Sequence, residues 1–341
     1  MKSYFLVEPG SIELREIPMP TPAKGELIVK IESALTCGTD LKAYRRGHPK
    51  MPMPTPFGHE FSGTIIDAGS SANGYHQGDA IMGAPTAPCG DCHYCRRRLE
   101  NLCPLTMREW LLGAYAEYIK IPRRIVEKNM FIKPAFLSFE EAGFLEPLAC
   151  VIHGIEPLHI FPEDTVLIIG AGPIGLLHVL MAKLKGAHKI IVAGKHEQKL
   201  RIATELGAHF VINTVTENSV ETVQEITKGY GANWIFECTG MPAVWEESIS
   251  LASKGATIIL FGGCPPDTKI TADTSRLHYD EISLMGSFHY TPGDVEKAYQ
   301  LLVDKQIEVS KLITAKYSLD DLPKAFNLLL EGKGIKYAIR P

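Results

Sequence analysis

The chain of 341 residues is predicted to be an α/β protein with two domains, one of them built on a six-stranded, doubly wound parallel sheet. Its length is about twice that of an ordinary domain. Residues 165–288 alternate apolar runs with helical stretches, whereas the first 145 residues carry short alternating runs with many prolines and glycines. This second pattern predicts a smaller, mainly antiparallel barrel or sandwich.

Six apolar runs are the strand candidates of the parallel sheet. Helical stretches and glycine-marked turns separate them, a pattern typical of a parallel sheet that is covered on both faces. The runs are residues 165–170, 189–194, 209–213, 233–240, 256–262 and 281–288.

The other domain is expected to use both ends of the chain. Alternating runs at 26–32 and 61–67 predict short antiparallel strands. After residue 288 come helical stretches at 294–305 and 322–332 but no further crossover unit, so this tail is expected to pack on the first domain. The predicted domains are 1–147 with 288–341, and 148–287.

Composition argues against several functional classes. Lys and Arg number 35 against 39 Asp and Glu, a formal charge of −4, and no basic stretch is long enough to suggest nucleic-acid binding. The first apolar run spans only four residues, so no signal peptide and a cytoplasmic location are expected. Glycines and a proline interrupt the apolar stretch Val166–Ala182, which indicates a strand, a turn and a helix and no membrane span.

Four of the eight cysteines lie within fifteen residues, as Cys89-x-x-Cys92-x-x-Cys95-x7-Cys103. Cytoplasmic cysteines are seldom paired in disulfides, so a metal site explains the cluster better than free buried thiols do. Four thiolates match a closed tetrahedral zinc site, which leaves no position for a substrate. A structural zinc ion is therefore predicted.

The turn Gly170-Ala-Gly172-Pro173-Ile174-Gly175 lies between a predicted strand and a predicted helix, and it indicates dinucleotide binding. Gly170 would make the tight turn and Gly172 would let the backbone approach the pyrophosphate. Gly175 would allow close packing of helix and strand, and the helix N-terminus would face the diphosphate.

The next strand candidate ends at Gly194 and is followed by Lys195 and His196. An NAD-binding protein is expected to have Asp or Glu near this point to bind the ribose diol. No carboxylate is present there to repel a 2′-phosphate. Two side chains that can carry a positive charge are present, and they would attract it. The sequence thus predicts NADP in preference to NAD, although Glu197 lies near enough to keep NAD possible.

Three further segments carry metal-binding or catalytic residue types. They are Cys37-Gly-Thr39-Asp40, Gly58-His59-Glu60 and Glu146-Pro-Leu-Ala-Cys150. Each is weak alone, since a lone cysteine is usually a small core residue. Together with the four-cysteine loop and the GAGPIG turn, they resemble the zinc-containing medium-chain dehydrogenase/reductase superfamily, and within it the polyol, sugar and threonine dehydrogenase branch.

The resemblance covers essentially the whole chain. It implies a GroES-like catalytic domain, a Rossmann domain and two zinc ions per chain. It also implies hydride transfer between a secondary alcohol, or the matching ketone, and NAD(P), in a homodimer or homotetramer. Two other functions are considered. One is a zinc-independent medium-chain reductase, which would not need Cys37, His59 and Glu146 together, so their presence argues against it. The other is a non-catalytic NADP-binding structural or regulatory protein.

By this resemblance Cys37 and His59 would hold a catalytic zinc ion, with Glu60 or Glu146 as the carboxylate ligand and Cys150 as an alternative. A thiolate, an imidazole and one carboxylate would neutralise the ion and leave an open position for an alcohol oxygen. Zinc would then make the hydroxyl group more acidic near neutral pH.

The resemblance also assigns roles in proton transfer. Thr39 stands where the family has a hydroxyl group that takes the substrate proton, and Asp40 stands where a carboxylate orients the ligating histidine. Many members have a histidine three residues beyond that hydroxyl, but this chain has Lys42. Lys42, His48, or a ribose hydroxyl with water are the candidates for the final proton acceptor.

Overall fold

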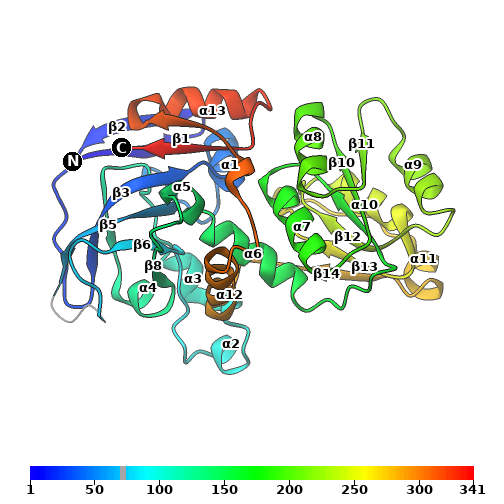
Figure 1. Cartoon of the computed structure of the whole chain (residues 1–341), viewed down its shortest axis with the longest axis horizontal. Helices are drawn as coiled ribbons and strands as arrows, with labels where there is room; N and C mark the ends of the chain where they lie inside the picture. Colours follow the sequence, from blue (N-terminus) through cyan, green and yellow to red (C-terminus); the bar gives the residue numbers. More distant parts are fainter. Residues whose placement is uncertain (70–73) are drawn as a thin grey trace. The chain divides into compact units, whose positions relative to one another are not determined.

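The computed structural model describes residues 1–69 and 74–341, and these divide into two compact units, each of which is drawn in Figure 1. The first unit comprises Met1–Cys150 and His289–Pro341, and the second comprises Val151–Phe288. None of the helices formed by these residues has the length and apolar character needed to cross a membrane.

The second unit contains the predicted six-stranded parallel sheet. Its strand order is β11-β10-β9-β12-β13-β14, and every neighbouring pair is parallel. The order reverses direction between β9 and β12, and ligands of such sheets bind beyond the carboxyl ends of the strands at that point. The strands are β9 (Thr165–Ile169), β10 (Lys189–Gly194), β11 (Phe210–Asn213), β12 (Ala232–Glu237), β13 (Ala252–Leu260) and β14 (Ser283–Gly286).

Helices connect these strands, as the alternating pattern predicts (Figure 1). The helix after β9 begins at Pro173, whose fixed φ suits the first turn, and ends before Gly186, which has a φ of +85°. The strand residues Leu167, Ile191 and Ile235 are fully buried in one core. The helices are α7 (Pro173–Leu184), α8 (Glu197–Leu206), α9 (Ser219–Ile226), α10 (Pro242–Leu251) and α11 (Thr274–Tyr279).

The first unit is built on a seven-stranded and a three-stranded sheet. The larger has the order β15-β16-β3-β5-β6-β8, with β7 also paired to β3, and the smaller has the order β2-β1-β4. All pairs among β1–β8 are antiparallel, as predicted. These strands are β1 (Lys2–Glu8), β2 (Ser11–Glu16), β3 (Leu27–Leu35), β4 (Thr55–Pro56), β5 (Glu60–Ala68), β6 (Ala80–Gly83), β7 (Tyr118–Ile121) and β8 (Met130–Ile132).

The prediction that no crossover unit follows residue 288 is wrong. A crossover unit does follow residue 288, because β15 (Ile313–Ser318) and β16 (Lys336–Arg340) pair in parallel and α13 (Leu322–Leu330) connects them. The strand β15 is half-exposed and mixes Thr, Lys and Ser with its apolar residues, so its apolar signal is weak. The tail does pack on the first unit, since β16 pairs with β3.

Short helices complete the first unit, and aromatic rings fill much of its core. The rings of Phe57 and Tyr115 lie 5.4 Å apart, and both contact Phe326 of α13. The α-helices are α1 (Gly38–Arg46), α2 (His93–Arg96), α3 (Pro104–Arg108), α4 (Arg123–Lys128), α5 (Phe139–Ala142), α6 (Leu145–Ile155, which continues into the second unit) and α12 (Pro292–Val303). Three 3₁₀ turns span Glu100–Leu102, Ser310–Leu312 and Leu319–Asp321.

Candidate active site

Strand pairing brings Cys37 and His59 together. The strands β3 and β5 are antiparallel, with Leu35 opposite Glu60. Cys37 follows the end of β3 and His59 precedes the start of β5, so both emerge at the same end of this strand pair. The ligand atoms of Cys37, His59 and Glu60 all lie within 4.8 Å of one another.

Cys37 is the N-cap of α1, and its sulfur accepts a hydrogen bond from the backbone N–H of Thr39 at 3.4 Å. The positive end of a helix favours a thiolate, the form of cysteine that binds metals. Burial and then the charge of Glu60 act in the opposite direction and raise the pKa of Cys37, which a bound cation would counter. Thr39 lies in the first turn of the same helix and Lys42 in the second.

His59 is held in one orientation by Asp40. Its Nδ1 lies 2.9 Å from Oδ1 of Asp40, whose side chain is fully buried. The hydroxyl of Tyr115 donates to the other oxygen of Asp40 at 2.8 Å. Because Nδ1 is engaged in this way, Nε2 is the nitrogen left to bind a metal ion.

Glu60 is buried and forms an ion pair with Lys336 of β16. The Nζ of Lys336 also donates to the carbonyl oxygen of Thr36 at 2.9 Å. Burial raises the pKa of Glu60 to about 7, and Lys336 opposes this shift. In the described part of the chain, Oε1 of Glu60 is buried without a hydrogen-bond partner, which suits an atom that faces a cation.

Glu146 belongs to a second group of donors. Its ligand atom lies within 4.8 Å of those of Cys150 and His289. Cys150 follows four residues later on α6, and its thiol donates to Oε1 of Glu146 at 3.6 Å. His289 Nε2 lies 2.6 Å from the hydroxyl of Thr86. Of the two predicted carboxylates, it is therefore Glu60 that groups with Cys37 and His59.

His48 follows α1 and is half-buried. Its Nδ1 accepts a hydrogen bond from the backbone N–H of Lys50 at 3.2 Å. The ring of Trp110 lies edge-on to both His48 and His59, with centroids 5.9 Å and 4.9 Å away. Burial lowers the pKa of His48. His48 thus lies one aromatic ring away from His59.

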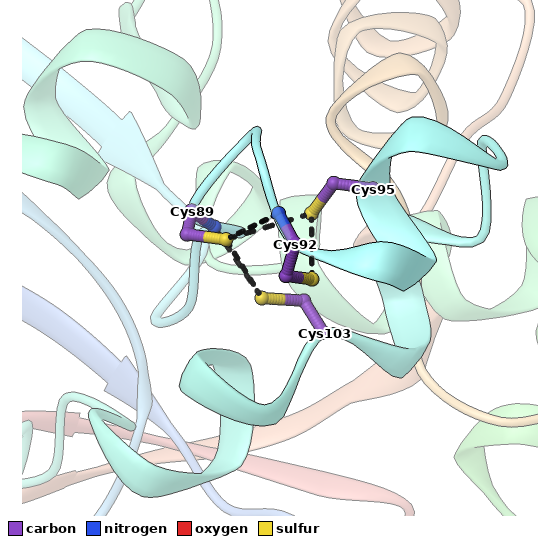
Figure 2. Close-up of side chains that lie close together, drawn as sticks. All are labelled: Cys89, Cys92, Cys95 and Cys103. Carbon is purple, nitrogen blue, oxygen red and sulfur yellow. Dashed lines mark hydrogen bonds between the residues drawn. The ribbon is translucent and has the colours of Figure 1, made fainter.

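The four-cysteine loop folds so that its sulfur atoms face one another (Figure 2). The Sγ atom of Cys89 lies 3.8 Å from that of Cys95 and 3.7 Å from that of Cys103, and Cys92 and Cys95 are 3.5 Å apart. Zinc–sulfur bonds of about 2.3 Å in a tetrahedron place sulfur atoms about 3.8 Å apart. These three sulfur–sulfur distances are therefore close to those of a tetrahedral zinc site, and all four sulfur atoms lie within 4.8 Å of one another.

The glycine turn after β9 has the geometry that a dinucleotide requires. Gly170 has a φ of +110°, which favours glycine, and open space surrounds the Cβ position of Gly172. A Cβ atom at Gly175 would lie 1.8 Å from the carbonyl oxygen of Gly170, so no side chain fits there. Gly172 is the N-cap of α7 and has no side chain to accept a hydrogen bond from the first turn of the helix, which leaves those N–H groups for an anion.

A cavity of about 560 Å³ opens beside this turn in the second unit. Five of the predicted cofactor-binding residues line it, whereas Pro173, Ile174 and Gly175 do not. The five are Gly170, Gly172, Gly194, Lys195 and His196.

Known proteins match this chain along its whole length. Residues 23–130 match the alcohol dehydrogenase GroES-like domain, and residues 173–304 match the zinc-binding dehydrogenase family. A sorbitol dehydrogenase from Halalkalibacterium halodurans is 34% identical over 97% of this chain and 96% of its own length. The chain belongs to the zinc-containing alcohol dehydrogenase family.

Two more relatives bear on the chemistry of this alcohol dehydrogenase. A D-arabitol-phosphate dehydrogenase from Enterococcus avium is 31% identical over 99% of this chain and 97% of its own length. A crystal structure from Sinorhizobium meliloti, assigned as a zinc-binding dehydrogenase bound to NADP, has a TM-score of 0.91 at 31% identity and covers 100% and 99% of the two chains. The protein is therefore an alcohol or polyol dehydrogenase, and it is not the non-catalytic protein considered above.

Two residues of this alcohol dehydrogenase site lie outside the sequence motifs, so the sequence analysis did not identify them. Trp110 contacts both imidazoles, but nothing near it in sequence marks it. Lys336 pairs with a residue 276 positions earlier. A lysine within the apolar run IKYAI was its only sequence signal, because a lysine there must be paired if the strand is buried.

Proposed function

We propose that this enzyme oxidises a secondary hydroxyl group of a polyol, sugar, cyclitol or hydroxy-amino acid, with NADP⁺ preferred to NAD⁺ as the hydride acceptor. The convergence of Cys37, His59 and Glu60 carries the proposal, because these three ligand types fit a zinc ion with an open position. The sorbitol and arabitol-phosphate dehydrogenases among its relatives support the substrate class.

The side chains of the first unit have distinct roles in this proposal. Cys37, His59 and Glu60 would hold the catalytic zinc ion, with Glu146 near enough to influence the charge of Glu60. Zinc bound there would supply a Lewis acid that makes a hydroxyl group more acidic. Asp40 fixes the His59 ring, so that its ligating nitrogen keeps one direction.

Proton transfer is assigned to side chains of α1 and to His48, which follows it. Thr39 would receive the hydroxyl proton of the substrate, since it lies two residues after the ligand Cys37. Lys42, His48, or a ribose hydroxyl with water would carry that proton away. Comparing kcat for Lys42→Met and His48→Gln, each measured with saturating substrate, identifies the acceptor.

The second unit is proposed to bind the dinucleotide. The N-terminus of α7 would face the diphosphate, and the nicotinamide would receive the hydrogen of the substrate C–H bond with both of its electrons. Lys195 and His196 would face the 2′-phosphate. We further propose that the chain assembles as a homodimer or homotetramer, which light scattering measures.

The deciding experiment combines metal removal with a substrate screen. Sorbitol, xylitol, threonine, myo-inositol derivatives and simple secondary alcohols are offered with NADP⁺ and with NAD⁺. Activity on one class should disappear after treatment with a chelator and return with zinc. Cys37→Ser or His59→Ala with the activity of the parent protein would refute the proposal, and a tenfold preference for NAD⁺ would refute its cofactor choice.

A further inference from the structure

Glu237 is a buried carboxylate at the end of β12. It lies next to the point where the strand order of the parallel sheet reverses direction, between β9 and β12. Its side chain is fully buried, and no lysine or arginine in the described part of the chain forms an ion pair with it. A buried carboxylate is costly unless hydrogen-bond donors satisfy it. Neutral donors must therefore surround Glu237.

These donors come from the turn of residues 238–241, which follows β12, and from α10. The backbone N–H of Thr239 donates to Oε1 of Glu237 at 2.7 Å, and the hydroxyl of Thr239 donates to the same atom. The backbone N–H of Gly240 donates to Oε2 at 3.1 Å. The indole N–H of Trp245, on α10, donates to Oε2 at 2.7 Å. Both carboxylate oxygens thus hold the 238–241 turn in place.

Two residues of this turn, Thr239 and Met241, line the cavity beside the glycine turn. The hydroxyl of Thr239, which donates to Glu237, also accepts a hydrogen bond from the backbone N–H of Met241 at 3.2 Å. Met241 is the N-cap of α10 and makes no capping bond with its own side chain. The carboxylate therefore fixes both lining residues, Thr239 directly and Met241 through the Thr239 hydroxyl.

The 238–241 turn also packs closely against the turns that follow β9 and β13. A Cβ atom at Gly170 would lie 3.1 Å from Cγ2 of Thr239. A Cβ atom at Gly262 would lie 2.2 Å from the backbone nitrogen of Gly240 and 2.9 Å from Oε2 of Glu237. Ligands of such sheets bind beyond the strand ends at this point. A shift of the 238–241 turn would therefore change the shape of the cavity beside Gly170.

We propose that Glu237 is a positioning residue for the dinucleotide, and that its carboxylate holds the 238–241 turn in the conformation that binding requires. This inference rests on the proposed binding of NAD(P) in the cavity, and it adds a residue that acts from behind the cavity wall. Without the carboxylate the turn would populate other conformations, and only the fraction in the binding conformation could take the cofactor. The affinity falls by that fraction, because the cost of ordering the turn is moved from folding to binding.

The test measures binding of NADPH and NADH to the full-length, zinc-loaded protein by calorimetry. Glu237→Gln keeps the shape of the side chain, but its amide offers a single acceptor oxygen to these donors. This variant should weaken NADPH and NADH binding by the same factor, about 10- to 100-fold, with the binding stoichiometry unchanged. A purely structural role would have the opposite signature, because partial unfolding lowers the stoichiometry and leaves the Kd of the folded molecules unchanged.

Further variants isolate the bonds to the turn. Trp245→Phe removes the indole donor but leaves every bond between Glu237 and the turn, so it should change both affinities less than threefold. Glu225→Gln, which changes an exposed glutamate of α9 outside the cavity lining, should change neither. Thr239→Val loses the hydroxyl and should weaken both ligands at least threefold, whereas Thr239→Ser keeps it and should bind like the parent protein. This last pair tests the turn even if Glu237→Gln fails to fold.

The remaining outcomes distinguish the inference from the function on which it rests. Unchanged affinity in Glu237→Gln, or in Thr239→Val, would overturn the role of Glu237 and leave the proposed function standing. An equal loss in Trp245→Phe would also overturn it, since the bonds to the turn would then not be the cause. A loss confined to NADPH would do the same, because the turn is proposed to serve what the two ligands share. A parent protein that binds neither dinucleotide would overturn the proposed function itself.

Discussion

Lys336, on the last strand of the chain, forms a buried ion pair with Glu60, the residue next to His59. Both side chains are almost fully buried, at 1% and 0% exposure. Lys336 engages one carboxylate oxygen, and the other is buried without a hydrogen-bond partner among the described residues. The carboxylate therefore stands between a fixed lysine and the proposed metal position.

Lys336→Met is expected to destabilise the metal-free enzyme by about 3–5 kcal/mol, because it leaves a buried carboxylate without its cation. Zinc should restore part of this loss, since the ion can compensate the same carboxylate. Urea unfolding with and without zinc measures both effects. The matched variant Lys333→Met removes an exposed ion pair and should cost less than about 1 kcal/mol. Equal effects of the two variants would contradict the role of Lys336.

Asp40→Asn is expected to weaken zinc binding at the catalytic position about 10- to 100-fold. Asp40 receives hydrogen bonds on both oxygens, from His59 and Tyr115, and an amide can satisfy only one of these donors. Competition with a chromogenic chelator measures the affinity. Tyr115→Phe keeps the pair between Asp40 and His59, so a smaller loss is expected there. Parent-like zinc affinity in Asp40→Asn would show that the pair does not orient the ligand.

The two metal positions should lose zinc independently. Elemental analysis is expected to find two zinc ions per chain in the parent protein, and one in Cys92→Ser and in His59→Ala. The zinc ion left in Cys92→Ser should be the catalytic one, so a chelator should remove it and the activity together. The zinc ion left in His59→Ala should be the structural one. Cys264→Ser, outside both clusters, should keep two ions. One zinc ion per parent chain would rule out a metal in one of the clusters.

The buried side chain of His178 is expected to lower the free energy of unfolding in acid, because its protonation favours the unfolded chain. Burial lowers its pKa to about 4, and its Nδ1 bonds to the carbonyl oxygen of Ile174 at 2.9 Å. Its Nε2 is buried among Phe236 and Phe261 with no partner in the described residues. The unfolded chain titrates near 6.5, so this contribution is complete above pH 6.5 and is lost as the pH falls toward 4.

At pH 5 this loss amounts to about 2 kcal/mol relative to pH 7.5. Urea unfolding at both pH values measures it. His178→Gln should reduce the difference by that amount, even if the variant is less stable at every pH. His188→Gln, which changes an exposed histidine, should leave the difference unchanged. A pH dependence in His178→Gln equal to that of the parent would contradict the assignment.

Local patterns predicted most of the fold because secondary structure depends on neighbouring residues. The alternation of apolar runs and helices predicted all six strands of the parallel sheet. The strand Ile313–Ser318 was missed because half of its residues are polar or charged, so the crossover that contains it was missed as well. Its pairing with β16 supplies stability that its own sequence does not show.

The sequence by itself determined the cysteine loop and the glycine turn, because the residues of each lie within fifteen positions and meet through local chain geometry. Only the tertiary structure decided that Lys336 faces Glu60 and that Glu146 groups with Cys150 and His289. It also decided that Lys199 lines the cavity beside the glycine turn. Strand pairing and helix packing over long separations set these contacts, and no local pattern records which distant side chains will meet.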